Sequence, residues 1–181
     1  MIFKPKTITL KDGRTASFRP PCSADAAEML DYLKQCASET DFIIRTPEEC
    51  TETVEQEAVY LEKLRISSNN LMIVCIVDGS IAGNCQLTFN RRIKTRHRAS
   101  IAIALRSEYW GLGIGSAMFE EMIAAAREHG VTLLELQYVE GNERGRALYE
   151  KFGFKAFGVL KGAFVMPDGR VLDEVYMARE I

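Results

Sequence analysis

The stretch Tyr109-Trp110-Gly111-Leu112-Gly113-Ile114-Gly115-Ser116 lies between an apolar run and a segment with the apolar spacing of a helix. Glycines at alternate positions leave a row of backbone N–H groups that no Cβ covers. The helix that follows adds the positive end of its dipole. Exposed N–H groups and a helix N-terminus together bind anions such as pyrophosphate. The stretch therefore predicts a phosphate-binding turn that opens a helix, expected from Gly111 to Glu128.

Three kinds of phosphate-binding turn begin with glycines before a helix. A P-loop ends in a Lys-Ser/Thr pair, whereas this run ends Gly115-Ser116-Ala117 without lysine, which argues against nucleotide hydrolysis. The dinucleotide fingerprint needs a third glycine where this chain has Ser116, and it usually stands near the start of a domain. A seat for the pyrophosphate of coenzyme A fits the local pattern.

A second motif follows in the segment Val131–Phe154. A strand over Thr132–Val139 gives way to Gly141-Asn142, and a short helix then leads to Gly153-Phe154. With these two motifs in this order, the chain resembles the GNAT superfamily of acyl-CoA-dependent N-acyltransferases. The resemblance is close over about residues 68–160 and looser elsewhere.

The hallmark of that family is an R/Q-x-x-G-x-G/A turn, a helix, a strand, and then an Asn and an (A/L)-Y-x-K-x-G-F run. Gly113 and Gly115 supply the glycines of the turn, and Asn142 supplies the asparagine. The final run reads Leu148-Tyr149-Glu150-Lys151-Phe152-Gly153-Phe154. Trp110 replaces the Arg or Gln, so one side-chain contribution is expected to be missing while the backbone contacts remain.

The fold class expected from the pattern and the resemblance is α/β. A chain of 181 residues, 47% hydrophobic, suits one core, so we expect a single N-acetyltransferase domain over residues 1–181. The resemblance implies a GNAT-like mixed, mostly antiparallel, twisted sheet of about seven strands with helices on both faces. The expected order of elements is β–α–α–β–β–β–α–β–α–β–β.

Turn and capping residues place the boundaries of these elements. Asp12-Gly13 predicts a small hairpin, and Ser23 is a candidate N-cap for the first helix. Thr46-Pro47-Glu48-Glu49 forms a capping box that predicts a second helix to about Ser67. Asp78-Gly79 joins two apolar strands in a further hairpin.

The resemblance implies that the cofactor is acetyl-CoA, which donates the acyl group as a cosubstrate. Its pantetheine arm is expected to lie like an extra strand against the backbone of Ile103 and Leu105. The Leu105 N–H is expected to stabilise the oxyanion of the tetrahedral intermediate. The implied cofactor-binding residues are Ile103, Leu105, Trp110, Gly111, Leu112, Gly113, Ile114, Gly115, Ser116, Asn142 and Tyr149.

Tyr149 is the expected proton donor to the departing thiolate, and its alternative role is to pack its ring in the core. Asn142 is expected to cap the helix that carries Tyr149. The resemblance implies that its side chain also contacts the pantetheine arm or orders the loop beside it. The Ser116 hydroxyl either binds a phosphate oxygen or faces solvent.

Candidates for the general base are Glu39, Asp41, His97 and Glu135. We rank Glu39 first, because the segment from Glu39 to Ile43 lies where the family builds its acceptor pocket. The catalytic residues predicted from the sequence are therefore Tyr149, Leu105 and Glu39. No structural metal is expected, since the five cysteines lack CxxC or Cys/His spacing.

Composition limits the partners. The net charge is −2, and the basic run Arg91–Arg98 lacks interleaved aromatic residues, so we expect a solvated loop there and no nucleic acid. No apolar run is long enough to span a membrane. The odd number of cysteines, without CxxC or Cys/His spacing, favours a reduced cytoplasmic protein. A homodimer is possible, because the family is often dimeric.

The ending from Asp168 to Ala178 resembles GNAT members similar to amino-acid and ribosomal-protein N-acetyltransferases. It supports a primary-amine acceptor, either a small molecule such as an amino acid or polyamine, or a protein N-terminus. Two functions remain open, an N-acetyltransferase and a non-catalytic acyl-CoA-binding sensor. Asn142 and Tyr149 favour the enzyme.

Overall fold

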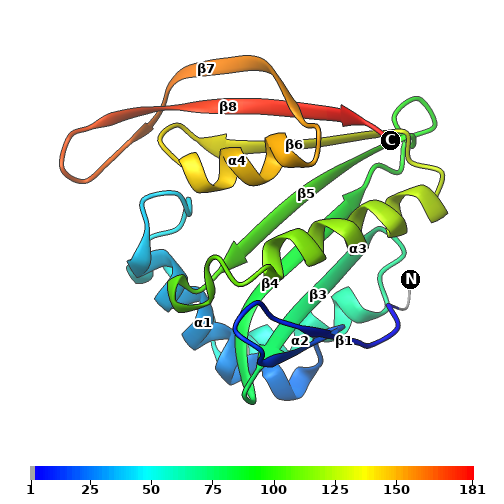
Figure 1. Ribbon diagram of the computed structural model, residues 1–181. Coiled ribbons are helices and arrows are strands. Elements are labelled where there is room, and N and C mark those ends of the chain that lie inside the picture. Colours follow the sequence, from blue (N-terminus) through cyan, green and yellow to red (C-terminus); the bar gives the residue numbers. More distant parts are fainter. Residues whose placement is uncertain (1–2) are drawn as a thin grey trace.

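A computed structural model describes residues 3–181 as one eight-stranded sheet with helices on both faces (Figure 1). The strand order is β1-β2-β3-β4-β5-β6-β8-β7, and every neighbouring pair is antiparallel except β5–β6, which is parallel. The strands are β1 (Lys6–Thr9), β2 (Thr15–Arg19), β3 (Asn70–Val77), β4 (Ser80–Phe89), β5 (Arg98–Leu105), β6 (Leu133–Val139), β7 (Lys155–Val165) and β8 (Val171–Glu180). The helices are α1 (Ala26–Glu39), α2 (Val54–Arg65), α3 (Ile114–Glu128) and α4 (Glu143–Lys151), with single turns η1 (Ser23–Asp25), η2 (Pro47–Glu49) and η3 (Ser107–Tyr109).

The predicted α/β class is confirmed, and the predicted count of about seven strands is low by one. Both strands of the hairpin around Asp12-Gly13 join the sheet, where the predicted order counted that hairpin as one strand. The Asp12 carboxylate accepts from the Arg14 N–H at 3.1 Å, and Gly13 adopts a φ of 88°. These two features close the turn.

The predicted start of the second helix is wrong. The Thr46 capping box does form, since the Thr46 N–H donates to the Glu49 carboxylate at 2.9 Å, but it caps only the single turn η2. A second box follows, in which the Thr53 side chain accepts from the Gln56 N–H at 3.3 Å. Helix α2 begins at this second box.

The helix after the glycine turn begins at Ile114 and not at Gly111. Gly111 and Gly113 have φ values of 78° and 97°, which a right-handed helix excludes. Ser23 likewise opens the short turn η1, and the N-cap of α1 is Asp25.

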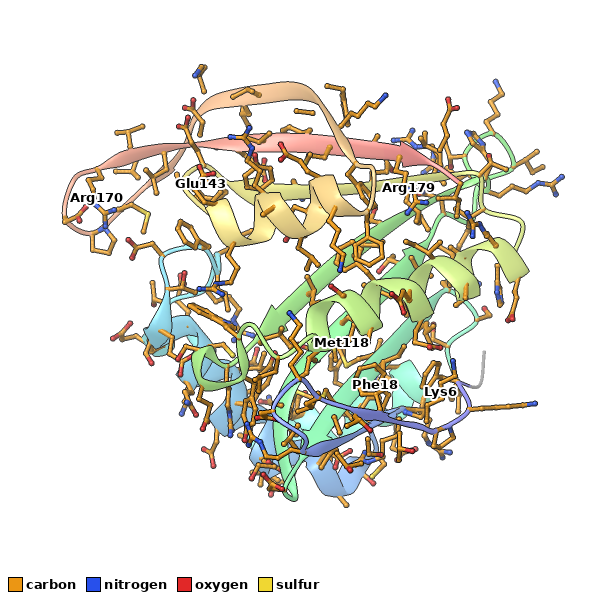
Figure 2. All side chains as sticks on the ribbon, viewed as in Figure 1. Lys6, Phe18, Met118, Glu143, Arg170 and Arg179 are labelled. Atoms are coloured by element: carbon orange, nitrogen blue, oxygen red, sulfur yellow. The ribbon has the colours of Figure 1, made fainter. Side chains whose placement is uncertain are left out.

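Two hydrophobic clusters lie on opposite faces of the sheet. Helices α1 and α2 cover one face, where Met29, Tyr32 and Leu61 are fully buried. Helices α3 and α4 cover the other face (Figure 1), and Phe18 of β2 and Met118 of α3, both labelled in Figure 2, belong to its cluster.

The Tyr32 hydroxyl joins β4 and β5 at one rung of their ladder. It donates to the Ala104 carbonyl oxygen at 2.9 Å and accepts from the Asn84 N–H at 3.2 Å. Burial raises the pKa of Tyr32 well above its usual value, so the hydroxyl keeps its proton. Helix α1 is thereby tied to the end of β5.

Gly83 lies beside this rung, opposite Leu105, and leaves no room for a side chain. A Cβ there would lie 2.1 Å from the Leu105 Cδ2 and 2.7 Å from the Ala104 carbonyl oxygen. We predict that Gly83→Ala lowers the free energy of unfolding by about 1–3 kcal/mol, the usual cost of overpacking.

The matched control is Gly158→Ala on edge strand β7, where an added Cβ meets nothing within 4 Å. Urea denaturation should place this control within about 0.5 kcal/mol of the parent. Equal stability of the two variants would contradict the close approach of β4 and β5.

Candidate active site

Strands β5 and β6 pair over only three residues each, Arg98–Ser100 with Leu133–Glu135, and then diverge (Figure 1). On its other side β5 continues in register with β4 as far as Leu105. The half of β5 that ends at Leu105 therefore has a sheet partner on one side only.

Hydrogen bonds to β4 fix the direction of the β5 backbone. The Asn90 N–H donates to the Arg98 carbonyl at 3.2 Å, and the Arg106 N–H donates to the Ala82 carbonyl at 3.0 Å. Even-numbered residues of β5 thus bond to β4, and alternate residues of an antiparallel pair point the opposite way. The N–H and C=O groups of Ile103 and Leu105 consequently face the side on which β6 has diverged.

Trp110 ties the turn back to the end of β5. Its indole Nε1–H donates to the Leu105 carbonyl oxygen at 2.9 Å. The Arg144 guanidinium of α4 lies 4.5 Å from the centre of the Trp110 ring, within cation–π range. The residue that replaces the expected Arg or Gln therefore joins β5 to α4, a contact the sequence motif does not indicate.

The glycine turn leaves the N-terminus of α3 open. Gly113 is the N-cap and makes no side-chain cap, and the first helical turn contains no acidic residue. A Cβ on Gly111 would meet nothing within 4 Å. The first N–H groups of α3, together with its dipole, therefore fit an anion such as pyrophosphate.

A cationic side chain of α4 lies at this end of α3. The Lys151 ammonium of α4 donates to the Ser116 hydroxyl at 2.8 Å. Ser116 thus holds the Lys151 ammonium beside the turn, where a bound phosphate would also contact this ammonium. Gly115 has a packing role, because a Cβ there would lie 3.2 Å from the Leu148 Cδ2 and 3.6 Å from the Leu105 Cδ1.

Tyr149 packs its ring in the core, and its role as a proton donor stays a prediction. Its ring is buried and packs at 5.7 Å from the Phe119 ring and 5.8 Å from the Tyr138 ring. Its hydroxyl has no hydrogen-bond partner among residues 3–181, yet it is not sealed from solvent. Burial, with a smaller contribution from Tyr138, raises the pKa of Tyr149 to about 12. The phenol is therefore protonated at neutral pH and free to donate.

Asn142 caps α4, as predicted. Its Oδ1 accepts from the Gly145 N–H at 2.9 Å. Gly145 must be small, because a Cβ there would lie 2.8 Å from the Asn142 amide nitrogen.

The four candidate bases are dispersed. Glu39 is the last residue of α1; its carboxylate accepts from the Ser107 N–H at 2.7 Å and from the Gln35 amide at 2.7 Å. The bond to Ser107, the second residue after the end of β5, places the Glu39 carboxylate near Leu105.

The other three candidates are engaged elsewhere or lie at the wrong end. Asp41 pairs at 2.7 Å with Arg170, at the tip of the β7–β8 hairpin (Figure 2). Glu135 forms an ion pair with Arg98 at the start of β5. His97 precedes β5, so it lies at the end of the strand opposite to Leu105.

Arg106 and Tyr32 were not predicted from the sequence as site residues. Both lie where α1 meets the end of β5, with the Arg106 guanidinium carbon 5.8 Å from the centre of the Tyr32 ring. No spacing marks Arg106, although its position directly after Leu105 was a usable signal. In the part of the chain that the structure describes, no group of three His, Cys, Asp or Glu could hold a metal, and no helix is long and apolar enough to cross a membrane.

The sheet that opens beside β5, the bare N-terminus of α3 and the free phenol of Tyr149 define a protein that binds an acyl-CoA. Sequence comparison agrees, since the model of the Acetyltransferase (GNAT) family matches residues 29–154. The chain belongs to this family and is an acetyl-CoA-dependent N-acyltransferase.

Two curated relatives differ in their acceptors. The L-amino acid N-acetyltransferase AaaT of Escherichia coli K12 is 27% identical over 122 residues, which is 67% of this chain and 75% of the relative. The ribosomal protein bS18-alanine N-acetyltransferase of Haemophilus influenzae is 36% identical over 76 residues, 42% of this chain. That match spans only 51% of the second relative.

Two solved structures share the fold. A GNAT-family acetyltransferase from Streptococcus pneumoniae superposes with a TM-score of 0.85 at 29% identity, covering 92% of this chain and 99% of that one. A Salmonella typhimurium protein solved with its cofactor acetyl-CoA superposes with a TM-score of 0.77, covering 91% and 93%. At 17% identity, the similarity to the Salmonella typhimurium protein shows the fold alone.

We predict that Gly113→Ala weakens acetyl-CoA binding by about tenfold or more, equivalent to about 1.4 kcal/mol. The strain of a positive φ would displace the backbone, and the added Cβ would project where only the Lys11 Cγ lies within 4 Å and a phosphate must approach. Isothermal titration calorimetry measures the change.

Gly130→Ala is the matched control, because Gly130 has a φ of 70° and lies just past the other end of α3. It should lose similar stability and keep its acetyl-CoA affinity. Equal affinities in both folded variants would mean that the pyrophosphate binds elsewhere.

Proposed function

We propose that this protein transfers an acetyl group from acetyl-CoA to a primary amine by direct attack within a ternary complex. The observation that carries the proposal is the direction of the Leu105 backbone. Its N–H faces the side where β5 has no sheet partner, at the same end of the strand as the open turn. A donor at that point is suited to an oxyanion.

The glycine turn and β5 would hold the two halves of the donor. The first-turn N–H groups from Gly113 to Ser116, with Lys151 nearby, suit the pyrophosphate. The backbone of Ile103 and Leu105 would pair with the amides of the pantetheine arm as β6 pairs with the start of β5. The thioester carbonyl then reaches the Leu105 N–H.

Tyr149 would donate a proton to the leaving thiolate. With a pKa of about 12, the phenol is a weaker acid than a thiol of pKa about 8.5, so the transfer is efficient only against a thiolate held directly beside it. The hydroxyl has no competing partner among residues 3–181, which leaves it free for that contact.

Glu39 would face the amine on the acceptor side. Each of its oxygens accepts one hydrogen bond, from Ser107 or Gln35, and a carboxylate has about four acceptor sites, so capacity remains for an ammonium. The acceptor is a small amine or a protein N-terminus, the two classes that the relatives' names represent. A homodimer and a cytoplasmic location stay predictions from the sequence.

The alternative that the sequence left open, an acyl-CoA-binding sensor without transfer activity, is disfavoured by the family assignment. It would use the same turn and the same β5 backbone, so binding alone does not separate the two functions. The free Tyr149 hydroxyl favours the enzyme. Release of free thiol from acetyl-CoA in the presence of an amine panel distinguishes them, because a sensor releases none.

We predict that Tyr149→Phe lowers kcat by about ten- to a thousand-fold, within or just below the usual range for an acid–base group. The ring that packs on Phe119 and Tyr138 is kept, so acetyl-CoA affinity and melting temperature should change little. Because the pKa is raised to about 12, the parent should show no loss of rate from Tyr149 ionisation below about pH 11.

Tyr138→Phe is a suitable control, since it removes a hydroxyl from a neighbouring ring of the same aromatic cluster. Its kcat should stay near that of the parent. Parent-like kcat in Tyr149→Phe, with chemistry shown to limit the rate, would remove Tyr149 from the mechanism.

A further inference from the structure

Arg106 follows the last residue of β5 and points to the face opposite the glycine turn. The Arg106 N–H donates to the Ala82 carbonyl oxygen, so the backbone of Arg106 has the same orientation as that of Ala104. The two side chains therefore point to the same face of the sheet. Ala104 packs in the cluster of α1 and α2, whereas Leu105 packs in the cluster of α3. The guanidinium therefore lies on the α1 side of β5, away from the phosphate seat.

The Arg106 guanidinium has no anionic partner. Its Nε is the one side-chain nitrogen or oxygen of residues 3–181 that is buried without a hydrogen bond. None of the ion pairs in this part of the chain includes Arg106. Its terminal nitrogens also make no hydrogen bond there, but solvent reaches them.

Two other partly buried arginines of this chain are paired with carboxylates. Arg19 donates to both carboxylate oxygens of Asp25 at 2.7 Å, and Arg98 forms an ion pair with Glu135. A buried donor without a partner is costly, and more so on a charged group. The unfilled donors of Arg106 therefore indicate an anion that is absent from the protein itself.

The Glu39 carboxylate and the Arg106 guanidinium both lie at the end of β5, but they form no ion pair with each other. Burial raises the pKa of the Cys36 thiol to about 11; Glu39 adds to this rise and Arg106 opposes it, so both charges lie close to that residue. The two side chains nevertheless do not form an ion pair, because Glu39 is held by Ser107 and Gln35. Leu105, the proposed oxyanion donor, directly precedes Arg106.

We infer that the acceptor is an amine that also carries a carboxylate, such as a free α-amino acid, and that Arg106 binds this carboxylate while Glu39 faces the ammonium. The inference rests on the proposed acetyl transfer and narrows its acceptor. A guanidinium binds a carboxylate through two parallel bonds, for which Arg106 has its donors free. The N-terminal residue of a protein lacks that carboxylate, because its carboxyl group forms a peptide bond. A polyamine would bring a positive charge next to the guanidinium.

The test compares each free L-amino acid with its own carboxamide as acceptor, by thiol release from acetyl-CoA. In the parent, kcat/KM for at least one amino acid should exceed that for its amide by about 10- to 100-fold, the range for a hydrogen-bonded charge. Arg106→Gln should reduce this ratio to about one, mainly by raising KM for the acid.

Arg127→Gln, which removes an exposed arginine from α3, is the control for net charge and should keep the parent's ratio. The parent's own acid-to-amide ratio needs no variant, so misfolding of Arg106→Gln would not prevent a decision. Thiol release with amides or peptides as fast as with acids would overturn the carboxylate assignment and leave acetyl transfer intact. No thiol release with any amine would overturn both.

Discussion

The architecture depends on a short parallel contact, the three residue pairs between β5 and β6. A longer parallel ladder would satisfy the backbone of Ile103 and Leu105 within the protein. A shorter one would not hold β6, β8 and β7 to the rest of the sheet, since this pair is their only strand-to-strand link to it among the described residues. Three pairs suffice to join the two halves and leave the end of β5 free for a ligand.

The free end of β5 is fixed from both faces. On one face, α1 contributes the Tyr32 hydroxyl to Ala104 and the Glu39 carboxylate to the Ser107 N–H. On the other, the Trp110 indole binds the Leu105 carbonyl. A strand without a second neighbour would otherwise be mobile, and an oxyanion donor is useful only when it is held in advance. The same anchors would separate the proposed cofactor side from the proposed acceptor side, where Arg106 lies.

The sequence predicted the fold class and, apart from the second strand of the first hairpin, the order of elements, because periodicity and glycine spacing are local signals. It misplaced the start of α2, since two capping boxes at Thr46 and Thr53 lie seven residues apart and only tertiary packing decides which one continues. No motif or spacing marks Arg106, and its position directly after Leu105 was the one signal the sequence offered. Its importance comes from the absence of a partner, which depends on what α1 presents to it and therefore on the folded chain.

Amide hydrogen exchange along β5, with and without coenzyme A, tests the central claim most directly. Bound coenzyme should slow exchange at Ile103 and Leu105, whose N–H groups face away from β4, by about tenfold or more, as new hydrogen bonds do. The Arg106 amide, already bonded to Ala82 at 3.0 Å, should change little. Coenzyme binding, verified by calorimetry, that leaves Ile103 and Leu105 unprotected would contradict the account.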